Sequence, residues 1–140
     1  MARGSGDESL TMVLTQALDE VSRRVEEITD AEGLSLEQWL VLHELVVHGD
    51  QGMRDLVADT RIDDSTLTRV VDRLAARGLV YREADPADRR RVLVSAGARG
   101  RTLHARLAPS VEQAERRLLD HDRPTLRESL LRLARPHAPT

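Results

Sequence analysis

The near absence of aromatic residues constrains the fold of this chain more than any other feature of its sequence. The 140 residues include one Trp, one Tyr and no Phe, so the core must be built almost entirely from Leu, Val, Ala and Ile. Aliphatic side chains fill a core well when they form stripes along helices, because such stripes interdigitate without large rings. We therefore expect a mostly helical fold. A chain of this length suits one domain, over residues 1–140.

Apolar spacing predicts long amphipathic helices in two regions near the ends of the chain: one helix over residues 8–32 and two helices over residues 97–136, the last of which begins at Pro124. In the first, apolar residues recur at the steps of three and four that one helix face requires: Leu14, Leu18, Val21, Val25 and Ile28. In the second, the apolar positions include Leu118, Leu126 and Leu130. The first stripe is too long for a lone chain of this size to cover, so we expect both regions to form a homodimer. Residues 1–7 are small and polar, and we expect them to be a disordered tail.

The middle of the chain predicts three shorter helices. Ser35 followed by Gln38 is a capping-box pattern, which opens the first of them. A short helix and a tight turn then lead to a third helix, over residues 64–77. Either Asp63 or Asp64 can cap this third helix, because both carry a short acceptor side chain where the helix begins.

The apolar period changes from helical to extended after Gly78. Two short segments, LVYREA and RVLV, flank the polar loop of residues 85–90, which predicts a β-hairpin with arginines at its tip. A helix, a tight turn, a second helix and a hairpin in this order form a winged helix-turn-helix. We assign this DNA-binding fold to residues 34–95.

The predicted helix over residues 64–77 has an apolar face and a polar face. The polar face carries Ser65, Thr66, Arg69, Asp72 and Arg73. Hydroxyl groups in the first turn of a helix can reach phosphates or base edges of DNA, and Arg can bond guanine with two hydrogen bonds. A polar face that is merely exposed to solvent would carry the same residues, so this helix alone does not establish DNA binding. The arginines of the hairpin add independent support, because they can enter the minor groove while the helix occupies the major groove.

The net charge of −3 does not exclude nucleic acid as a partner. Residues 65–91 hold seven Arg against four Asp and Glu, so positive charge is concentrated in the segment that would meet phosphates. Local potential, more than total charge, governs attraction to DNA.

Two segments, GLSLEQWLVLHEL and MRDLVADTRIDDSTLTRVVDRLAARGLVYREADPADRRRVLV, resemble the multiple antibiotic resistance regulator (MarR) family of winged-helix repressors. The resemblance runs from Leu34 to Val94, and its most specific pieces are TRVVDRLAARGLV and the wing tip DPADRR. It implies a homodimer that binds a pseudo-palindromic operator in double-stranded DNA and regulates transcription, mainly as a repressor. It also implies a small-molecule effector, bound between the dimerisation helices and the winged regions.

The resemblance further implies which residues meet DNA. Those expected in the major groove are Ser65, Thr66, Thr68, Arg69 and Arg73. Arg90, with Arg89 beside it, is expected in the minor groove, and we expect Arg77 to contact phosphate. Asp63 and Asp88 are expected to support the wing, Asp63 through an ion pair with Arg90.

Two other functions remain open from the residues alone. The first is a helical, dimeric interaction protein that does not bind DNA, and the arginine-bearing hairpin argues against it. The second, with less support, is a small helical enzyme. The chain has no Cys, no Gly-x-Ser-x-Gly elbow and no phosphate-binding Gly loop, so we expect no enzymatic activity and no cofactor.

Three further features bear on ligands and location. The five His residues lack the spacing of a metal site, so we expect no bound metal. Trp39 is expected to pack in the core and to border the effector pocket. No apolar run reaches the roughly 20 residues that a membrane helix needs, and the N-terminus lacks a signal-peptide core, so we expect a cytoplasmic protein without a membrane partner.

Overall fold

The computed structural model describes residues 8–119 and 123–135. In chain order, its elements are α1 (Leu10–Thr29), η1 (Asp30–Glu32), α2 (Leu36–His48), β1 (Gln51–Gly52), α3 (Met53–Thr60), α4 (Asp64–Ala76), β2 (Val80–Ala84), β3 (Val92–Ala96), α5 (Ala98–Leu119) and α6 (Arg123–Ala134). The expected fold, mostly helical with a β-hairpin wing, is confirmed. The tail expected at residues 1–7 and the helix end expected at residue 136 lie outside the described residues.

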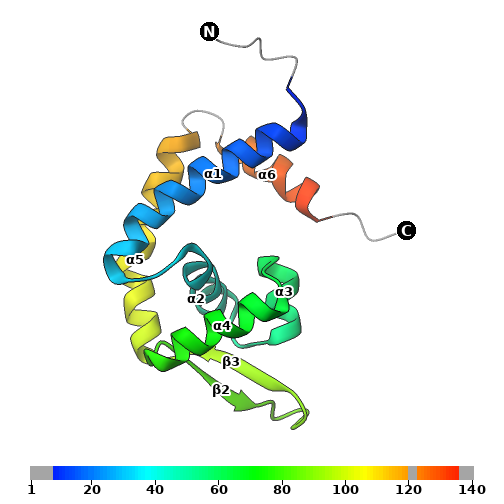
Figure 1. The fold of residues 1–140 in the computed structure, drawn as a ribbon, viewed down its shortest axis with the longest axis vertical. Helices are drawn as coiled ribbons and strands as arrows, with labels where there is room; N and C mark the ends of the chain where they lie inside the picture. Colours follow the sequence, from blue (N-terminus) through cyan, green and yellow to red (C-terminus); the bar gives the residue numbers. More distant parts are fainter. Residues whose placement is uncertain (1–7, 120–122, 136–140) are drawn as a thin grey trace, which may run out of the picture.

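The elements form two ends joined along one side of the molecule. Helices α1 and α6 lie together at one end, while α2, α3, α4 and the sheet lie at the other (Figure 1). Helix α5 runs between them, where it packs along α1 and also contacts α2 and β3. The winged region is connected to the terminal helices through α5, through contacts between α1 and α2, and through a hydrogen bond from the Arg61 guanidinium to the carbonyl oxygen of Ala134 on α6 at 3.3 Å.

Helix α4 buries the apolar face that its sequence predicts. Its Leu67, Val71 and Leu74 are fully buried, and it packs against α2, whose Leu42 and Leu45 are also fully buried. Burying one such side chain contributes about 1.5–3 kcal/mol to stability. This packing fixes which side of α4 faces outward.

The sheet has three antiparallel strands in the order β1-β3-β2. Strands β2 and β3 form the predicted hairpin, with Val80 opposite Ala96. Strand β1 has only two residues, of which Gln51 pairs with Val94. Two residues are too few to show the alternation of side chains that is typical of a strand. This strand is therefore defined only by its pairing with β3, which is distant in sequence.

Side-chain caps set the starts of two helices in the winged region. Gln38 donates its backbone N–H to the Ser35 hydroxyl at 3.2 Å, and Ser35 donates its own N–H to the Gln38 side chain at 2.9 Å. The predicted capping box is therefore confirmed. Of the two candidate aspartates, Asp63 is the one that caps α4. The end of α4 is followed by Gly78, whose φ of +70° is rare for a residue with a side chain.

Half of the expected dimer stripe on α1 is already covered within the protomer. Val25 is buried, and Val21 and Ile28 pack against the core, because α5 lies beside this half of α1. Val25 is therefore moved from the expected interface to the protomer core, whereas Val21 and Ile28 are only partly buried and their place in an interface stays a prediction. In the other half, Leu14 is half-buried and Leu18 keeps 65% of its surface exposed. The large side chains of α6 that are also exposed are Leu126, Leu130, Leu131 and Leu133.

Gly100→Ala should destabilise the protein strongly. A Cβ at this position would lie 2.1 Å from the carbonyl oxygen of Leu79, whereas a Cβ at Gly97 would come no closer than 3.5 Å to its neighbours. Rotation of a side chain cannot relieve an overlap with backbone, so we expect a loss of about 1–3 kcal/mol or more in the free energy of unfolding. Urea denaturation measures this loss. Gly97→Ala is the matched control, and equal losses in the two variants would contradict the explanation.

Candidate nucleic-acid interface

The outward face of α4 gathers the residues expected in the major groove. Ser65, Thr68, Arg69 and Arg73 are exposed, and Thr66 is half-buried. Within the described chain, neither arginine forms an ion pair with a carboxylate. Both guanidinium groups therefore keep their hydrogen-bond donors available to a ligand that approaches this face.

Asp63 organises the first turn of α4. Its Oδ1 accepts hydrogen bonds from the Thr66 backbone N–H and the Ser65 hydroxyl, both at 2.9 Å, and its Oδ2 accepts from the Thr66 hydroxyl at 3.1 Å. The Thr66 N–H, followed by the two hydroxyl groups, holds the pKa of Asp63 below its ordinary value. Because both hydroxyl hydrogens are directed to Asp63, the hydroxyl oxygens present lone pairs to an approaching partner.

The expected ion pair between Asp63 and Arg90 is wrong for this structure. Both carboxylate oxygens of Asp63 are engaged by the first turn of α4. Arg90 has no carboxylate partner among residues 8–119 and 123–135. The cap joins Asp63 to groups within three residues of it along the chain. An ion pair with Arg90 would instead have to order a long, exposed side chain.

Aspartates shape the wing tip, residues 85–91, through backbone contacts. Asp88 accepts the backbone N–H of Arg90 at 3.1 Å, and Asp85 likewise accepts a backbone N–H two residues ahead, at 2.8 Å. The backbone N–H of Asp88 also donates to the carbonyl oxygen of Asp85 at 3.2 Å. The carboxylates therefore hold the loop, while the side chains of Arg89 and Arg90 remain exposed.

Two arginines of this region are bound within the protein. Arg77 donates to the carbonyl oxygens of Gly33 at 3.1 Å and Glu32 at 2.9 Å, which ties the end of α4 to the connection between α1 and α2. The phosphate contact expected of Arg77 stays a prediction; in the protein alone, its exposed guanidinium has this structural role. Arg82 pairs with Asp72 and joins β2 to α4. Sequence reasoning missed both contacts, because spacing along a chain does not reveal partners on separate elements.

The remaining exposed arginines share one end of the molecule. Helix α4 lies against the sheet, and the wing projects from the end opposite α1 and α6 (Figure 1). The arginines on α4 and in the wing tip that keep free donors are Arg69, Arg73, Arg89, Arg90 and Arg91. A helix fits the major groove and a hairpin arginine fits the narrow minor groove, so this arrangement can address one DNA duplex with both elements.

A second feature is a pocket of about 230 Å³ between α1, α2 and α5, which we call the apolar pocket. Most of its lining is apolar: Leu18, Val21, Val25, Leu36, Trp39, Leu40, Ala108 and Val111. The polar residues that line it are Ser22, His43, Glu112 and Glu115. Trp39 is buried in the core and also borders this pocket, as the sequence predicts.

Two histidines meet beside the apolar pocket. His43 Nδ1 and His104 Nε2 are 2.9 Å apart, and the Trp39 ring stacks on His104 with ring centroids 5.0 Å apart. Burial, and then the neighbouring His43, lower the pKa of His104, while Glu112 acts in the opposite direction. His104 is therefore kept neutral at neutral pH and bonded to the histidine that lines the pocket. Sequence reasoning missed this pair because its members are 61 positions apart.

No three His, Cys, Asp or Glu residues in ranges 8–119 and 123–135 are grouped so that they could hold a metal ion. In the same ranges, no helix combines the length and the apolar character needed to cross a bilayer.

Known proteins similar to this chain include transcriptional repressors. The sequence profile of the MarR family matches residues 34–92. The HTH-type transcriptional repressor NicR of Pseudomonas putida is 36% identical over 76 residues. That match covers 54% of this chain and 48% of the relative, so it spans about half of the relative's length.

Solved structures extend the similarity over almost the whole chain. CouR from Rhodococcus jostii RHA1, bound to p-coumaroyl-CoA, is 28% identical with a TM-score of 0.85, covering 99% of this chain and 100% of that one. BpsR of Bordetella bronchiseptica is 30% identical with a TM-score of 0.77, covering 94% of each chain. DNA binding by BpsR is regulated by 6-hydroxynicotinic acid.

The lowered pKa of His104 predicts that acid weakens the fold. An unfolded histidine takes up its proton near pH 6.5, and the folded protein resists this because His104 is buried beside His43. The free energy of unfolding should therefore fall as the pH drops from 7 through 6.5 toward 5. His104→Gln removes the titrating group, so its stability should depend less on pH in this window. Chemical denaturation at several pH values measures this, and equal slopes for both proteins would contradict the assignment.

Proposed function

This chain belongs to the MarR family, and from that premise we propose that it is a ligand-responsive transcriptional repressor that binds a pseudo-palindromic DNA operator as a homodimer. Binding to an operator would block access to the promoter. A protein with this function would act in the cytoplasm, where the chromosome lies. Operator symmetry would mirror the symmetry of the dimer, with recognition helices about one DNA turn apart.

One observation carries the proposal for DNA binding. The exposed face of α4 and the wing present five arginines without ion-pair partners among the described residues, at the same end of the molecule. We assign Ser65, Thr66, Thr68, Arg69 and Arg73 to the major groove. Arg90, with Arg89 beside it, would enter the minor groove, where the negative potential is strongest. Asp63 and Asp88 would support these elements through the α4 cap and the wing tip.

The unpartnered apolar side chains on the terminal helices support a homodimer. Leu18 on α1 is largely exposed, and four leucines on α6 are exposed in the protomer. A contiguous apolar face of this kind marks an interface, because a soluble monomer rarely exposes one. Leu14, Leu18, Leu118, Leu126 and Leu130 are the expected interface residues that stay outside the protomer core. The outer half of α1 and the helix α6 would then pack against the same surface of a second chain.

The apolar pocket supports a role for a small-molecule effector. It lies where α1 and α5 meet α2, so a ligand there would touch both the terminal helices and the winged region. Its volume of about 230 Å³ and its Trp39 side chain suit one aromatic ring. A shift of the winged region by a few ångströms would separate the recognition helices from their half-sites and release DNA.

Arg90→Ala should weaken operator binding without weakening the fold. An exposed guanidinium adds little to folding, whereas in a narrow minor groove it meets concentrated negative potential. We expect affinity to fall about tenfold or more, with the loss largest on operators with A·T-rich flanks, and Arg90→Lys to recover part of it. Gel-shift titration with the DNA beside the protein's own coding region measures affinity, and thermal melting measures stability.

The matched control is Arg24→Ala on α1, which removes the same charge at the other end of the molecule. It should leave DNA affinity almost unchanged. A variant Arg90→Ala that unfolds, while its folded fraction binds DNA normally, would show that the wing arginine is structural. The same conclusion would follow if Arg24→Ala weakened binding equally.

Leu18→Asp should separate the dimer into folded monomers. The side chain is exposed in the protomer, so a charge there costs little within one chain but would be buried without a partner in the interface. Light scattering during size-exclusion chromatography at micromolar concentration measures the mass. Val47→Asp, at an exposed apolar position on α2, is the control and should remain dimeric. A folded monomer of the unmodified chain under these conditions would exclude the proposed interface.

A further inference from the structure

Three hydroxyl groups on the outward side of α4 donate their hydrogens back into the protein. Ser65 and Thr66 donate to the carboxylate of Asp63, at 2.9 and 3.1 Å. Thr68 donates to the backbone carbonyl oxygen of Asp64, at 2.9 Å. Because a hydroxyl group has one hydrogen, each of the three has used its donor and offers only lone pairs to a partner.

The partners of these hydroxyl groups fix the direction of the bonds. A carbonyl oxygen can only accept a hydrogen bond, and so can an ionised carboxylate. The Thr66 backbone N–H, followed by the Ser65 and Thr66 hydroxyl groups, holds the pKa of Asp63 below its ordinary value. Asp63 is therefore ionised at neutral pH, and the hydroxyl groups bonded to it act as acceptors toward DNA.

The side chains of residues 63–68 are poorly matched to phosphate. Phosphate oxygens are negatively charged acceptors, and the three hydroxyl groups have no hydrogen left to donate to them. Asp64 adds an exposed carboxylate that has no cationic partner in the described segments, and its charge repels phosphate. These side chains suit hydrogen-bond donors on base edges instead.

The next part of the same helix has the opposite polarity. Arg69 and Arg73 are exposed, and a guanidinium group can only donate. In the major groove, the only donors on base edges are the amino groups at N4 of cytosine and N6 of adenine, whereas N7 and O6 of guanine accept. The recognition helix is thus divided into an acceptor part that matches an amino group and a donor part that matches guanine.

We propose that Asp63 determines which bases α4 selects. It holds Ser65 and Thr66 as acceptors, so the first turns of the helix recognise the exocyclic amino group of a cytosine or an adenine in each operator half-site. This inference rests on the proposed function, in which α4 enters the major groove. Asp63 is a positioning residue, because it acts through the two hydroxyl groups. Thymine or guanine at the same place would set a base oxygen against a hydroxyl oxygen, which leaves two acceptors without a donor.

Base analogues that lack only the amino group test this recognition with the full-length protein. Pyrimidin-2-one replaces cytosine and purine replaces adenine, one position at a time, in both half-sites of the operator beside the coding region. Gel-shift titration should show a loss of about tenfold or more in affinity at one position, or at two adjacent positions, of each half-site. The base type at that position distinguishes cytosine from adenine. The loss should shrink to less than about twofold in whichever of Ser65→Ala and Thr66→Ala removes the hydroxyl that meets the amino group.

Asp63→Asn separates base selection from helix capping. Asparagine also caps helices, so we expect thermal melting to change little. Its amide group can donate to a hydroxyl oxygen, which frees the hydroxyl hydrogen for a base oxygen. The roughly tenfold preference for the natural base should therefore fall to about threefold or less. Asp64→Asn is the matched control, because it removes the same charge one residue away, while Thr68 is held by the backbone of Asp64 and not by its side chain. This control should keep the preference.

Several results would overturn the proposal. Equal affinity for the natural operator and every analogue would show that no amino group is recognised. A folded Asp63→Asn protein that keeps the full preference, or an Asp64→Asn protein that loses it instead, would remove Asp63 from base selection. Losses that Ser65→Ala and Thr66→Ala cause equally on natural and analogue operators would place the hydroxyl groups against phosphate.

Two further outcomes keep this inference separate from folding and from the proposed function. If Asp63→Asn does not fold, the response of Ser65→Ala and Thr66→Ala to the analogues decides the question, because both variants keep Asp63 and its bond to the Thr66 backbone N–H. An unmodified protein that binds no operator would overturn the proposed function. One that binds its operator but does not distinguish the analogues would overturn this inference alone.

Discussion

The close contact between α5 and Leu79 is the constraint on which the arrangement of the two ends depends. At Gly100 the helix backbone approaches the carbonyl group of Leu79 so nearly that a Cβ would lie 2.1 Å from its oxygen. A few residues earlier, Arg77 donates two hydrogen bonds to the connection between α1 and α2. The recognition helix, the wing and the terminal helices therefore meet at one closely packed joint. Close-packed interiors transmit strain, so a displacement of α5 is felt by α4.

Acidic side chains explain how an overall negative chain presents a cationic surface. Asp63, Asp85 and Asp88 direct their carboxylates to backbone N–H groups of the α4 cap and the wing tip. These local bonds shape the loops without neutralising the neighbouring Arg89 and Arg90. Positive potential is consequently concentrated on the two elements proposed to meet DNA, while the excess negative charge lies elsewhere on the chain.

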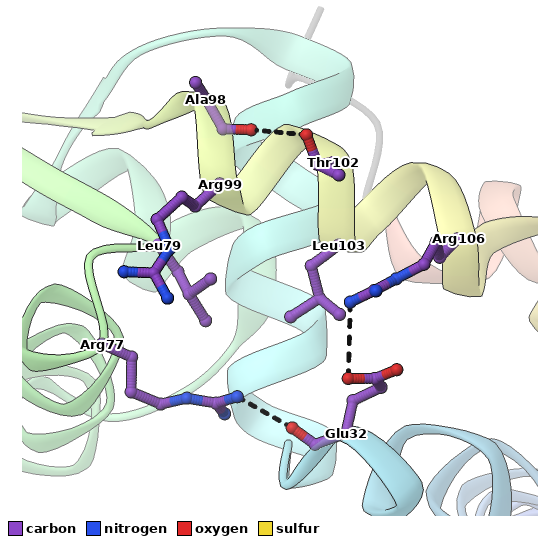
Figure 2. A pocket seen from close by; sticks show the side chains of 8 residues that line it. All are labelled: Glu32, Arg77, Leu79, Ala98, Arg99, Thr102, Leu103 and Arg106. Carbon is purple, nitrogen blue, oxygen red and sulfur yellow. Dashed lines mark hydrogen bonds and ion pairs between the residues drawn. The ribbon is translucent and has the colours of Figure 1, made fainter.

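Two cavities border α5, the apolar pocket and a cleft between the end of α4, η1 and the first turns of α5 (Figure 2), and they differ in charge because different residue types line them. The apolar pocket is bordered by aliphatic side chains, Trp39 and a coupled histidine pair, whereas the cleft is bordered by guanidinium groups. Both cavities touch the joint between the winged region and the terminal helices, the part of the fold that would set the distance between the recognition helices in the proposed dimer.

Local spacing along the sequence determined the helices, the Ser35 capping box, the hairpin and the outward face of α4, because each depends on residues within a few positions of one another. The family resemblance rested on the same contiguous segments. Contacts between distant segments could only be decided by the tertiary structure. Packing of α5 on α1 moved Val25 from the expected interface into the core, and pairing with Val94 made a strand of Gln51. Arg77 bonded to carbonyl groups 44 and 45 residues away, and Asp63 was engaged by its own helix and not by Arg90. The physical reason is that a side chain with several possible partners bonds to the ones that the packed backbone brings within hydrogen-bond distance. The separation of two residues along the sequence does not determine their distance in the folded protein.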